Sequence, residues 1–492
     1  MYALQISARV PRLASSSLRR SRAVSSLSPL IDIINRNAAS LEKAEQTNST
    51  QLPILSQPFH PSSEAFRKDP EAAESAAQIV AAALQLAATL SPPMEAIYQI
   101  AAGPFKGAAL RICMEANIAE ILREAGPQGM HVQEIGQKTG QDPRKLARFL
   151  RYLATNHIFE EVGPDVFRNN RLSGVLDTGK ESAALAYNPD SKYEGTTGIT
   201  AFVNHHLDEV AKASVHAWEN LSDPARAVSE EQRESSLANY LGKDVSIWEW
   251  FEDPEQASRR KRFDIAMKGA AAMESAEAIR AGYDWGSLPK GSTVVDVGGG
   301  IGFATAAVCD KFPELNYVVQ DLAGAIQNAG NFWAERNPDA ITNKTVALES
   351  HSCFEPQPSR PVSVFFIKHV LHGTSDKYGK KVLDHLRFAA SKDTKLVVAE
   401  YIVPYACRLP SAAEEGEVPG SRSTEAPAPL LANYGSSLVY SADMAMFFAS
   451  NAQERTFRDM QRLLLSAGWK VVKVNRQKGG HMTLQFYEAI PV

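Results

Sequence analysis

The chain has 492 residues, with 52 Lys and Arg against 56 Asp and Glu, so its formal net charge is −4. At about 100–200 residues per domain this length predicts two or three domains, and an apolar content of 44% argues against a disordered chain. The near balance of charge disfavours a protein that coats nucleic acid or an anionic membrane. The scattered cysteines lack a CxxC pair, which excludes a disulfide scaffold and a thiolate zinc site and fits a reducing compartment: Cys113, Cys309, Cys353 and Cys407.

The first 31 residues differ from the rest of the chain, because they contain five Arg, eight Ser and no acidic residue. This composition is typical of a mitochondrial transit peptide, and a disordered leader without a targeting role is the alternative. We therefore expect residues 1–45 to form a disordered basic leader or a targeting segment. The expected location is the cytoplasm, with mitochondria left open by the leader.

No stretch has the roughly 18 unbroken apolar residues that a membrane-spanning helix needs. The nearest candidate, residues 76–90, is rich in Ala and is interrupted by Gln78, Gln85 and Thr89. We expect an amphipathic or buried helix there and no contact with a membrane.

Residues 46–185 are predicted to form a helical module of the winged-helix type. Asp142 followed by Pro143 indicates a helix start, because Asp caps free backbone N–H groups and Pro fits the first turn. Residues 160–167 are predicted to form two short strands around a Gly-Pro turn. Apolar residues at helical spacing mark the buried face of the helix: Leu146, Phe149, Leu150 and Leu153.

A winged helix also raises DNA binding as an alternative, since basic residues lie opposite this apolar face: Arg144, Lys145, Arg148 and Arg151. A solvated basic face is the commoner outcome for such a helix, and the chain as a whole is slightly acidic. We therefore expect no nucleic-acid partner.

Residues 186–290 are predicted to form a helical connector rich in large aromatic side chains. Most of these side chains should be core, and some could line an aromatic substrate pocket. They are Trp218, Trp248, Trp250, Phe251, Phe263 and Trp285.

The strongest local signal is TVVDVGGGIG at 293–302. A β-branched run that ends in a Gly-rich turn and leads into a helix is the ligand-binding crossover of a doubly wound α/β sheet. The dinucleotide pattern GxGxxG does not fit, because Phe303 and Thr305 occupy the positions of the third glycine. The sequence therefore predicts a ligand at this turn that is not NAD.

Further strands are predicted at 316–320, 362–368 and 394–403, with a closing pair at 471–474 and 482–487 around Gly479 and Gly480. Residues 291–492 should thus form an α/β domain with a mostly parallel sheet and one antiparallel strand. Asp321 at the tip of the second strand is placed to accept the hydroxyls of a ribose. The Pro-, Gly- and Glu-rich residues 407–434 are expected to be a flexible insertion within this domain.

Five ordered motifs resemble the S-adenosylmethionine-dependent O-methyltransferases, above all the caffeate-type plant enzymes and the fungal enzymes of aromatic and polyketide metabolism. They are VVDVGGGIG at 294–302, VVQDL at 318–322, FEPQP at 354–358, KHVLH at 368–372 and QERTF at 453–457. The resemblance covers about residues 94–492. It implies a class I methyltransferase domain of Rossmann-like fold, preceded by a winged-helix domain that forms a homodimer, which displaces the DNA-binding alternative.

The resemblance also implies roles for individual residues. His372 matches the general base, and Glu400 and Glu454 match two carboxylates that flank it. Two departures occur: Ser352-Cys353 replaces the usual Asp near the adenine, and Gly373-Thr374 replaces Asp-Trp after the base. The residues expected to bind S-adenosyl-L-methionine are Gly298, Gly299, Gly300, Asp321, Leu322, Ser352, Cys353 and Lys368.

These groups suit methyl transfer to a phenol. A phenol has a pKa near 10, so only about 0.1% is ionised at pH 7, and a nearby imidazole of pKa about 6.5 can accept the proton. Flanking carboxylates favour the protonated imidazole that develops. No metal is required, because no ligand cluster is apparent from spacing, and we expect His369 to have a structural role.

We therefore expect an enzyme that methylates a hydroxyl, most simply a phenol, of a small natural product such as an aromatic polyketide. The alternative is an S-adenosylmethionine-binding enzyme that catalyses a cyclisation or pericyclic rearrangement without methyl transfer. The Gly373-Thr374 departure keeps this alternative open.

Overall fold

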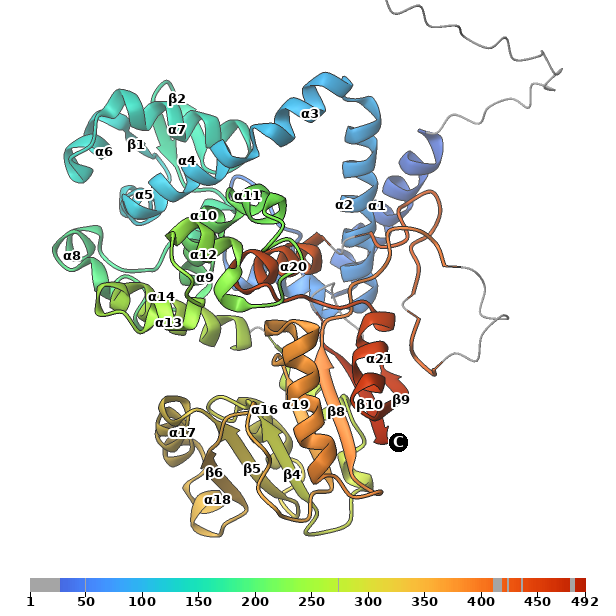
Figure 1. Cartoon of the computed structure of the whole chain (residues 1–492). Coiled ribbons are helices and arrows are strands. Elements are labelled where there is room, and N and C mark those ends of the chain that lie inside the picture. The colour runs from blue at the N-terminus through green and yellow to red at the C-terminus, as the bar shows by residue number, and fades with distance from the viewer. Residues whose placement is uncertain are drawn as a thin grey trace, which may run out of the picture.

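The computed structural model describes residues 27–48, 50–272, 274–409, 418–422, 424–434, 437–477 and 483–492. The winged-helix module and the α/β domain lie at opposite ends of the protein, with a middle layer of helices between them (Figure 1). The five arginines of the first 31 residues, the insertion's Glu414, Glu415 and Glu417, and the predicted Gly-Gly turn lie outside the described residues.

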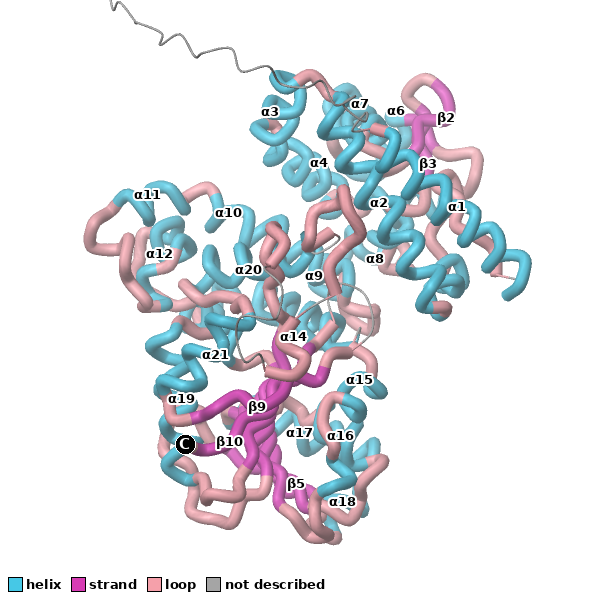
Figure 2. The backbone as a smooth tube through the Cα atoms, turned by 90° about the vertical axis from the view of Figure 1, so that its right-hand side faces the viewer, coloured by secondary structure: helices cyan, strands magenta, loops and turns pink. Residues whose placement is uncertain are grey.

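Two helices, α1 (Ser28–Asn48) and α2 (Pro70–Leu90), form a hairpin at the N-terminus (Figure 2). Leu30 and Ile33 of α1 are buried in a cluster with Ala82 of α2. The expectation of a disordered leader is therefore wrong from the start of α1 onward, because these apolar side chains find a packing partner in α2.

The described part of the insertion packs on this hairpin. Ala426 and Leu430 are buried in the same apolar cluster as the two helices. Arg408, at the start of the insertion, donates to the backbone oxygens of Ala426 and Leu430 at 2.9 and 3.2 Å. The expectation of a flexible loop is wrong for this part, because apolar contacts hold it against α1 and α2 and Arg408 joins its two ends.

Among the described helices, α2 is long and apolar enough to cross a membrane, with a mean hydropathy of 1.2 over its 18-residue window. Only 11% of that window is buried inside the protein. A single helix of this kind is weak evidence, because helices that never meet a lipid bilayer satisfy the same criteria.

The winged-helix module has the predicted order of elements. Asp142 caps α7 by accepting a hydrogen bond of 2.8 Å from the backbone N–H of Arg144, and Leu146, Leu150 and Leu153 are buried in the module core. Its three short strands form an antiparallel sheet in the order β1-β3-β2. The elements are α3 (Pro93–Ala101), α4 (Gly103–Glu115), α5 (Ile118–Ala125), β1 (Met130–His131), α6 (Val132–Thr139), α7 (Pro143–Thr155), β2 (Glu160–Gly163) and β3 (Val166–Arg168).

The basic face of α7 is partly paired within the module. Arg144 lies 3.1 Å from its own cap Asp142, and Arg151 lies 3.0 Å from Glu161 and 2.6 Å from Asp165. This pairing reduces the positive charge available for phosphates, which weakens the case for DNA binding.

The middle layer contains buried charges and a mixture of buried and exposed aromatic side chains. Asp208 accepts hydrogen bonds of 2.9 Å from both Arg259 and Arg262. Trp285 belongs to the core, whereas Trp218 is 74% exposed. The helices are α8 (Ser182–Tyr187), α9 (Ile199–His205), a π-helix (His206–Val210), α10 (Ala211–Ser214), α11 (Ala217–Ser222), α12 (Ser236–Leu241), α13 (Ile247–Phe251), α14 (Ala257–Ala272) and α15 (Ala276–Ala281).

The α/β domain has a seven-stranded sheet in the order β6-β5-β4-β7-β8-β10-β9. Among the described strands of this sheet, β10 alone runs opposite to the other six, which confirms the predicted mostly parallel sheet with one antiparallel strand. The strands are β4 (Thr293–Val297), β5 (Asn316–Asp321), β6 (Val346–Ser350), β7 (Val364–Lys368), β8 (Lys395–Glu400), β9 (Trp469–Asn475) and β10 (Gln485–Pro491).

Helices cover both faces of this sheet, as in a doubly wound fold. Trp333 of α17 packs in the core on one face, and Val382 of α19 and Met460 of α21 pack in the core on the other. Helix α20, although late in the chain, lies in the middle layer (Figure 1). The helices are α16 (Phe303–Cys309), α17 (Ala323–Arg336), α18 (Pro338–Thr342), α19 (Asp376–Ala389), α20 (Ser437–Ser450) and α21 (Phe457–Ser466).

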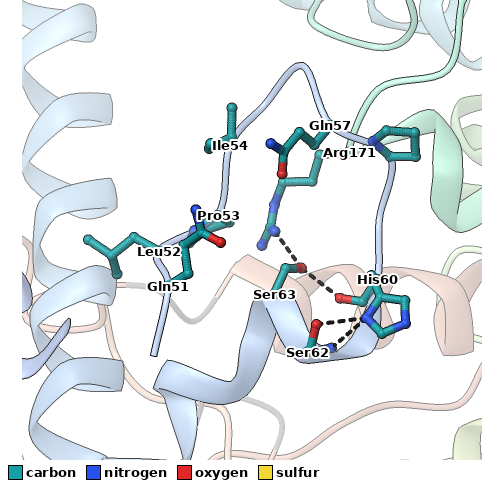
Figure 3. A pocket seen from close by; sticks show the side chains of 10 residues that line it. Gln51, Leu52, Pro53, Ile54, Gln57, His60, Ser62, Ser63 and Arg171 are labelled. Carbon is teal, nitrogen blue, oxygen red and sulfur yellow. Dashed lines mark hydrogen bonds between the residues drawn. The ribbon is translucent and has the colours of Figure 1, made fainter. Parts of the chain in front are cut away.

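A polar pocket lies where the segment between α1 and α2 meets the winged-helix module (Figure 3). Arg171 donates a hydrogen bond of 3.0 Å to Ser63 there and forms an ion pair with Glu64. None of the residues predicted to bind the cofactor or to act in catalysis lines this pocket.

Candidate active site

The glycine turn joins β4 to α16 at the carboxyl end of the parallel strands. Gly298 and Gly300 have φ values of +69° and +59°, a region that glycine adopts without strain. A Cβ atom at Gly300 would meet nothing within 4 Å, so this side of the turn is open to a ligand. A Cβ atom at Gly298 would lie 2.6 Å from the side chain of Val370, so the glycine turn directly contacts the segment that leads to His372.

Asp296 lies beneath the turn and is buried. Its carboxylate accepts a hydrogen bond of 2.5 Å from the hydroxyl of Thr305. Burial raises the pKa of Asp296 to about 6, although the bond to Thr305 opposes this shift.

Asp321 lies at the tip of β5 beside the glycine turn, as predicted. Its Oδ2 accepts from the backbone N–H of Gly300 at 2.8 Å, and its Oδ1 accepts from that of Leu322 at 2.7 Å. A carboxylate has about four lone-pair sites, so further sites remain for ribose hydroxyls. The open glycine turn and this carboxylate together fit S-adenosylmethionine, and the exposed side chain of Leu322 lies at the same edge.

Ser352 and Cys353 follow β6, a strand that was not predicted from the sequence. The hydroxyl of Ser352 accepts a hydrogen bond of 3.3 Å from the backbone N–H of Phe354. Burial, and next the charge of Asp321, raise the pKa of Cys353 to about 11, so the thiol is neutral at physiological pH. Cys353 therefore lies close enough to Asp321 for the two groups to interact electrostatically.

Lys368, at the end of β7, is paired with a residue that the sequence analysis did not identify. Its ammonium donates to Oε2 of Glu274 at 2.9 Å, and Oε1 of the same carboxylate lies 2.6 Å from Nε2 of His369. Nδ1 of His369 lies 3.5 Å from Oε2 of Glu400. Burial alone would lower the pKa of His369, but Glu274 and Glu400 outweigh it and raise the pKa to about 9.

His372 lies on a short 3-10 helix (Leu371–Gly373) that follows β7. Its Nδ1 lies 2.8 Å from Oε1 of Glu454, whose side chain is 1% exposed. The backbone N–H of Glu454 donates to Asp443 of α20 at 2.9 Å, which fixes this segment. The predicted base and one predicted carboxylate therefore form a buried pair.

Glu400 lies at the carboxyl end of β8, close to His372. Its Oε1 accepts hydrogen bonds from the backbone N–H groups of Val370, Leu371 and His372 at 3.1, 2.9 and 3.3 Å. No hydrogen bond joins Glu400 to the imidazole of His372 within the described residues, but one of its oxygens lies within 4.8 Å of a ring nitrogen of His372. Glu400 therefore lies beside the ring, and it also holds the backbone that carries His372.

Arg455 holds the same short helix from its other side. Its fully buried guanidinium donates to the backbone oxygens of Leu371 and Thr374 at 2.6 and 2.8 Å and to Asp376 at 2.9 Å. The hydroxyl of Thr374 also donates to Leu371 at 2.8 Å. The Gly-Thr departure from the family pattern is thus part of a well-bonded turn.

The fold brings Glu400 close to two histidines, His369 and His372, that precede it in the sequence. One ring nitrogen each of His369 and His372 and one oxygen of Glu400 lie within 4.8 Å of one another. The sequence shows no cluster of His and acidic residues with metal-ligand spacing, and no metal was expected from it. His369, expected to be structural, therefore lies beside the predicted base.

Comparisons with known proteins identify the family of this chain. An O-methyltransferase domain model matches residues 218–418, and an O-methyltransferase dimerisation domain model matches residues 98–178. The chain is 44% identical to the "4-O-methyltransferase 1" of Phanerochaete chrysosporium over 95% of its own length and 99% of that protein.

Two solved structures share the fold. The mitomycin 7-O-methyltransferase MmcR is 23% identical, with a TM-score of 0.59 over 81% of this chain and 98% of that one. LepI in complex with S-adenosylmethionine is 14% identical, with a TM-score of 0.64 over 94% of this chain and 99% of that one. The chain therefore belongs to the O-methyltransferase family with an N-terminal dimerisation domain, and its cofactor is S-adenosylmethionine.

Proposed function

We propose that this O-methyltransferase methylates a phenolic hydroxyl of a small natural product, such as an aromatic polyketide, with His372 as the general base. The observation that carries the proposal is the 2.8 Å contact between Nδ1 of His372 and the buried carboxylate of Glu454. The contact of Val370 with Gly298 supports it further, because it puts the base next to the cofactor turn.

Glu454 selects the tautomer of the base. A carboxylate can only accept a hydrogen bond, so Nδ1 of His372 carries the hydrogen and Nε2 keeps a lone pair. Nε2 can then take the proton of the acceptor hydroxyl. Such a positioned base contributes about 10²–10⁴-fold to the rate.

When bound, S-adenosylmethionine supplies a methyl group on a positively charged sulfur, which is already electrophilic. The turn of Gly298, Gly299 and Gly300 would hold the methionine end, and Asp321 would accept the ribose hydroxyls. Leu322, Ser352, Cys353 and Lys368 would line the adenosine. Glu400 and Arg455 keep the backbone of the base in place, which favours an in-line arrangement of oxygen, methyl and sulfur.

We also propose that the enzyme works as a homodimer. The dimerisation domain match begins within α3, where Ile97, Tyr98 and Ile100 are 65%, 68% and 73% exposed. A row of exposed apolar side chains on one helix suits burial by a second copy. Analytical ultracentrifugation should give the mass of two chains, and a monomer at micromolar concentration would contradict this.

The test is a screen of small phenols and polyketides with labelled S-adenosylmethionine. Methyl transfer predicts a methylated product and S-adenosylhomocysteine in equal amounts. The rearrangement alternative predicts conversion of the acceptor without any S-adenosylhomocysteine. His60→Gln, a substitution of an exposed histidine in the pocket of Figure 3, should behave like the wild type and serves as a handling control.

A further inference from the structure

The cluster of His369, His372 and Glu400 has the composition of a metal site. Two imidazoles and one carboxylate offer ligand atoms within 4.8 Å of one another. We propose that this cluster binds a divalent transition-metal ion such as Zn²⁺, and that the bound ion inhibits methyl transfer by occupying His372. Imidazole and carboxylate are ordinary zinc ligands.

Two of the candidate ligand atoms already lie close to each other. Nδ1 of His369 and Oε2 of Glu400 are buried, lack a hydrogen-bond partner among the described residues, and lie 3.5 Å apart. Zinc distances of about 2.0–2.2 Å to nitrogen and oxygen put neighbouring ligands of a tetrahedral site about 3.3–3.6 Å apart. This pair therefore has the separation that one shared ion requires.

The ligands are also held in place from behind. His369 is bonded through Nε2 to Glu274, and His372 through Nδ1 to Glu454, at 2.6 and 2.8 Å. Metal-bound histidines almost always use their second ring nitrogen in this way, which orients the ring and raises its basicity. Glu400 is fixed in turn by the three backbone N–H groups that its Oε1 accepts.

The local charge favours a cation. The buried carboxylates Glu274, Glu400 and Glu454 lie against the two histidines. The ion would displace the proton that the carboxylates otherwise hold on His369, as ligands lose protons when they bind a metal. The exchange replaces a single positive charge between carboxylates by a double one.

Inhibition follows from the shared ligand. A nitrogen of His372 that donates its lone pair to the ion cannot accept a proton from the acceptor hydroxyl. This consequence rests on the proposed role of His372, whereas the metal site itself does not.

The test is calorimetric titration of the chelator-treated full-length protein with ZnCl₂. The wild type should bind one equivalent that His369→Gln and Glu400→Gln do not bind. His60→Gln should retain that equivalent, since its histidine is exposed and lies outside the cluster. Any zinc held by the exposed thiol of Cys407 stays the same in all four proteins and cancels in the comparison. Zinc binding by His369→Gln with wild-type stoichiometry and affinity would overturn the proposal.

Glu274→Gln keeps the test decisive if a ligand variant does not fold. This variant retains all three ligands but removes the carboxylate that orients His369 and pairs with Lys368, so zinc affinity should fall about 10–100-fold. Unchanged affinity in folded Glu274→Gln would contradict the site. Activity separates the two proposals: one bound equivalent of zinc that leaves turnover unchanged would refute His372 as the base while leaving the metal site standing.

Discussion

Glu274 and His369 are joined by a 2.6 Å contact across the boundary between the helical middle layer and the α/β domain. Glu274 lies between α14 and α15, and its second oxygen accepts from Lys368 at 2.9 Å. Both side chains of the Glu274–Lys368 pair are largely buried, at 10% and 14% exposure. One carboxylate thus ties the connector to the strand end that carries the base.

Glu274→Gln should lower the free energy of unfolding by about 1–3 kcal/mol, because the amide leaves buried Lys368 without its anion and removes one of the two carboxylates beside His369. Urea unfolding followed by circular dichroism measures this loss. The matched control is Glu277→Gln, which breaks an exposed ion pair with Arg280 and should cost about 0–1 kcal/mol. Equal losses of unfolding free energy in the two variants would show that the buried contact stabilises the protein no more than the exposed ion pair does.

Glu454→Gln should lower kcat by about 10–100-fold while leaving the affinity for S-adenosylmethionine unchanged. The amide can still contact Nδ1 of His372, but it no longer stabilises the imidazolium that forms as the proton moves. Steady-state kinetics and calorimetry with the cofactor measure the two quantities. Glu335→Gln, at an exposed position on α17, is the control, and a drop in cofactor affinity in Glu454→Gln would point to a structural role instead.

Arg455→Lys should lower kcat and destabilise the protein by about 3 kcal/mol, because a lysine cannot reproduce the forked donation to Leu371 and Thr374. The expected kinetic signature is a loss of turnover with retained cofactor binding. Arg462→Lys on α21 is the control, since that guanidinium is 78% exposed. Wild-type stability in Arg455→Lys would mean that the short helix of the base does not depend on this residue.

Asp296 should make stability depend on pH. Its pKa rises from an unfolded value near 3.8 to about 6 in the fold, so the folded state binds the extra proton between these values. Stability therefore falls as pH rises from about 4 to about 6, by roughly 3 kcal/mol in total. Asp296→Asn cannot ionise, so its stability relative to the wild type should improve across this window in urea unfolding at pH 4.5, 5.5 and 7. Parallel curves for the two proteins would contradict the shift.

Elements with strong local signals were predictable from the sequence. Asp142-Pro143 marked the start of α7, and the β-branched run before Gly298 marked β4, because capping and burial act over a few residues. Strand β6 was missed, since it lies at the edge of the sheet and only Val346 of its residues is buried. Helix α1 was missed because its apolar side chains are buried only by contact with α2 and the insertion, which are distant in the sequence.

The site was predictable in its motifs but not in its contacts. The family resemblance identified His372 and Glu454, and the structure brings these two together. The family resemblance could not assign a role to Glu274, because no motif surrounds this residue and its partners are 94 and 95 residues away in the sequence. Separation in sequence also hid the approach of His369 to Glu400, which depends on the parallel pairing of β7 with β8.

The measurement that tests the central claim most directly is the turnover of His372→Asn beside its affinity for S-adenosylmethionine. The Asn side chain can still donate a hydrogen bond to Glu454, but it cannot accept the proton of a phenol. We predict that formation of S-adenosylhomocysteine falls by about 10²–10⁴-fold while cofactor affinity stays at the wild-type value. Turnover near the wild-type rate would contradict the assignment of His372 as the general base.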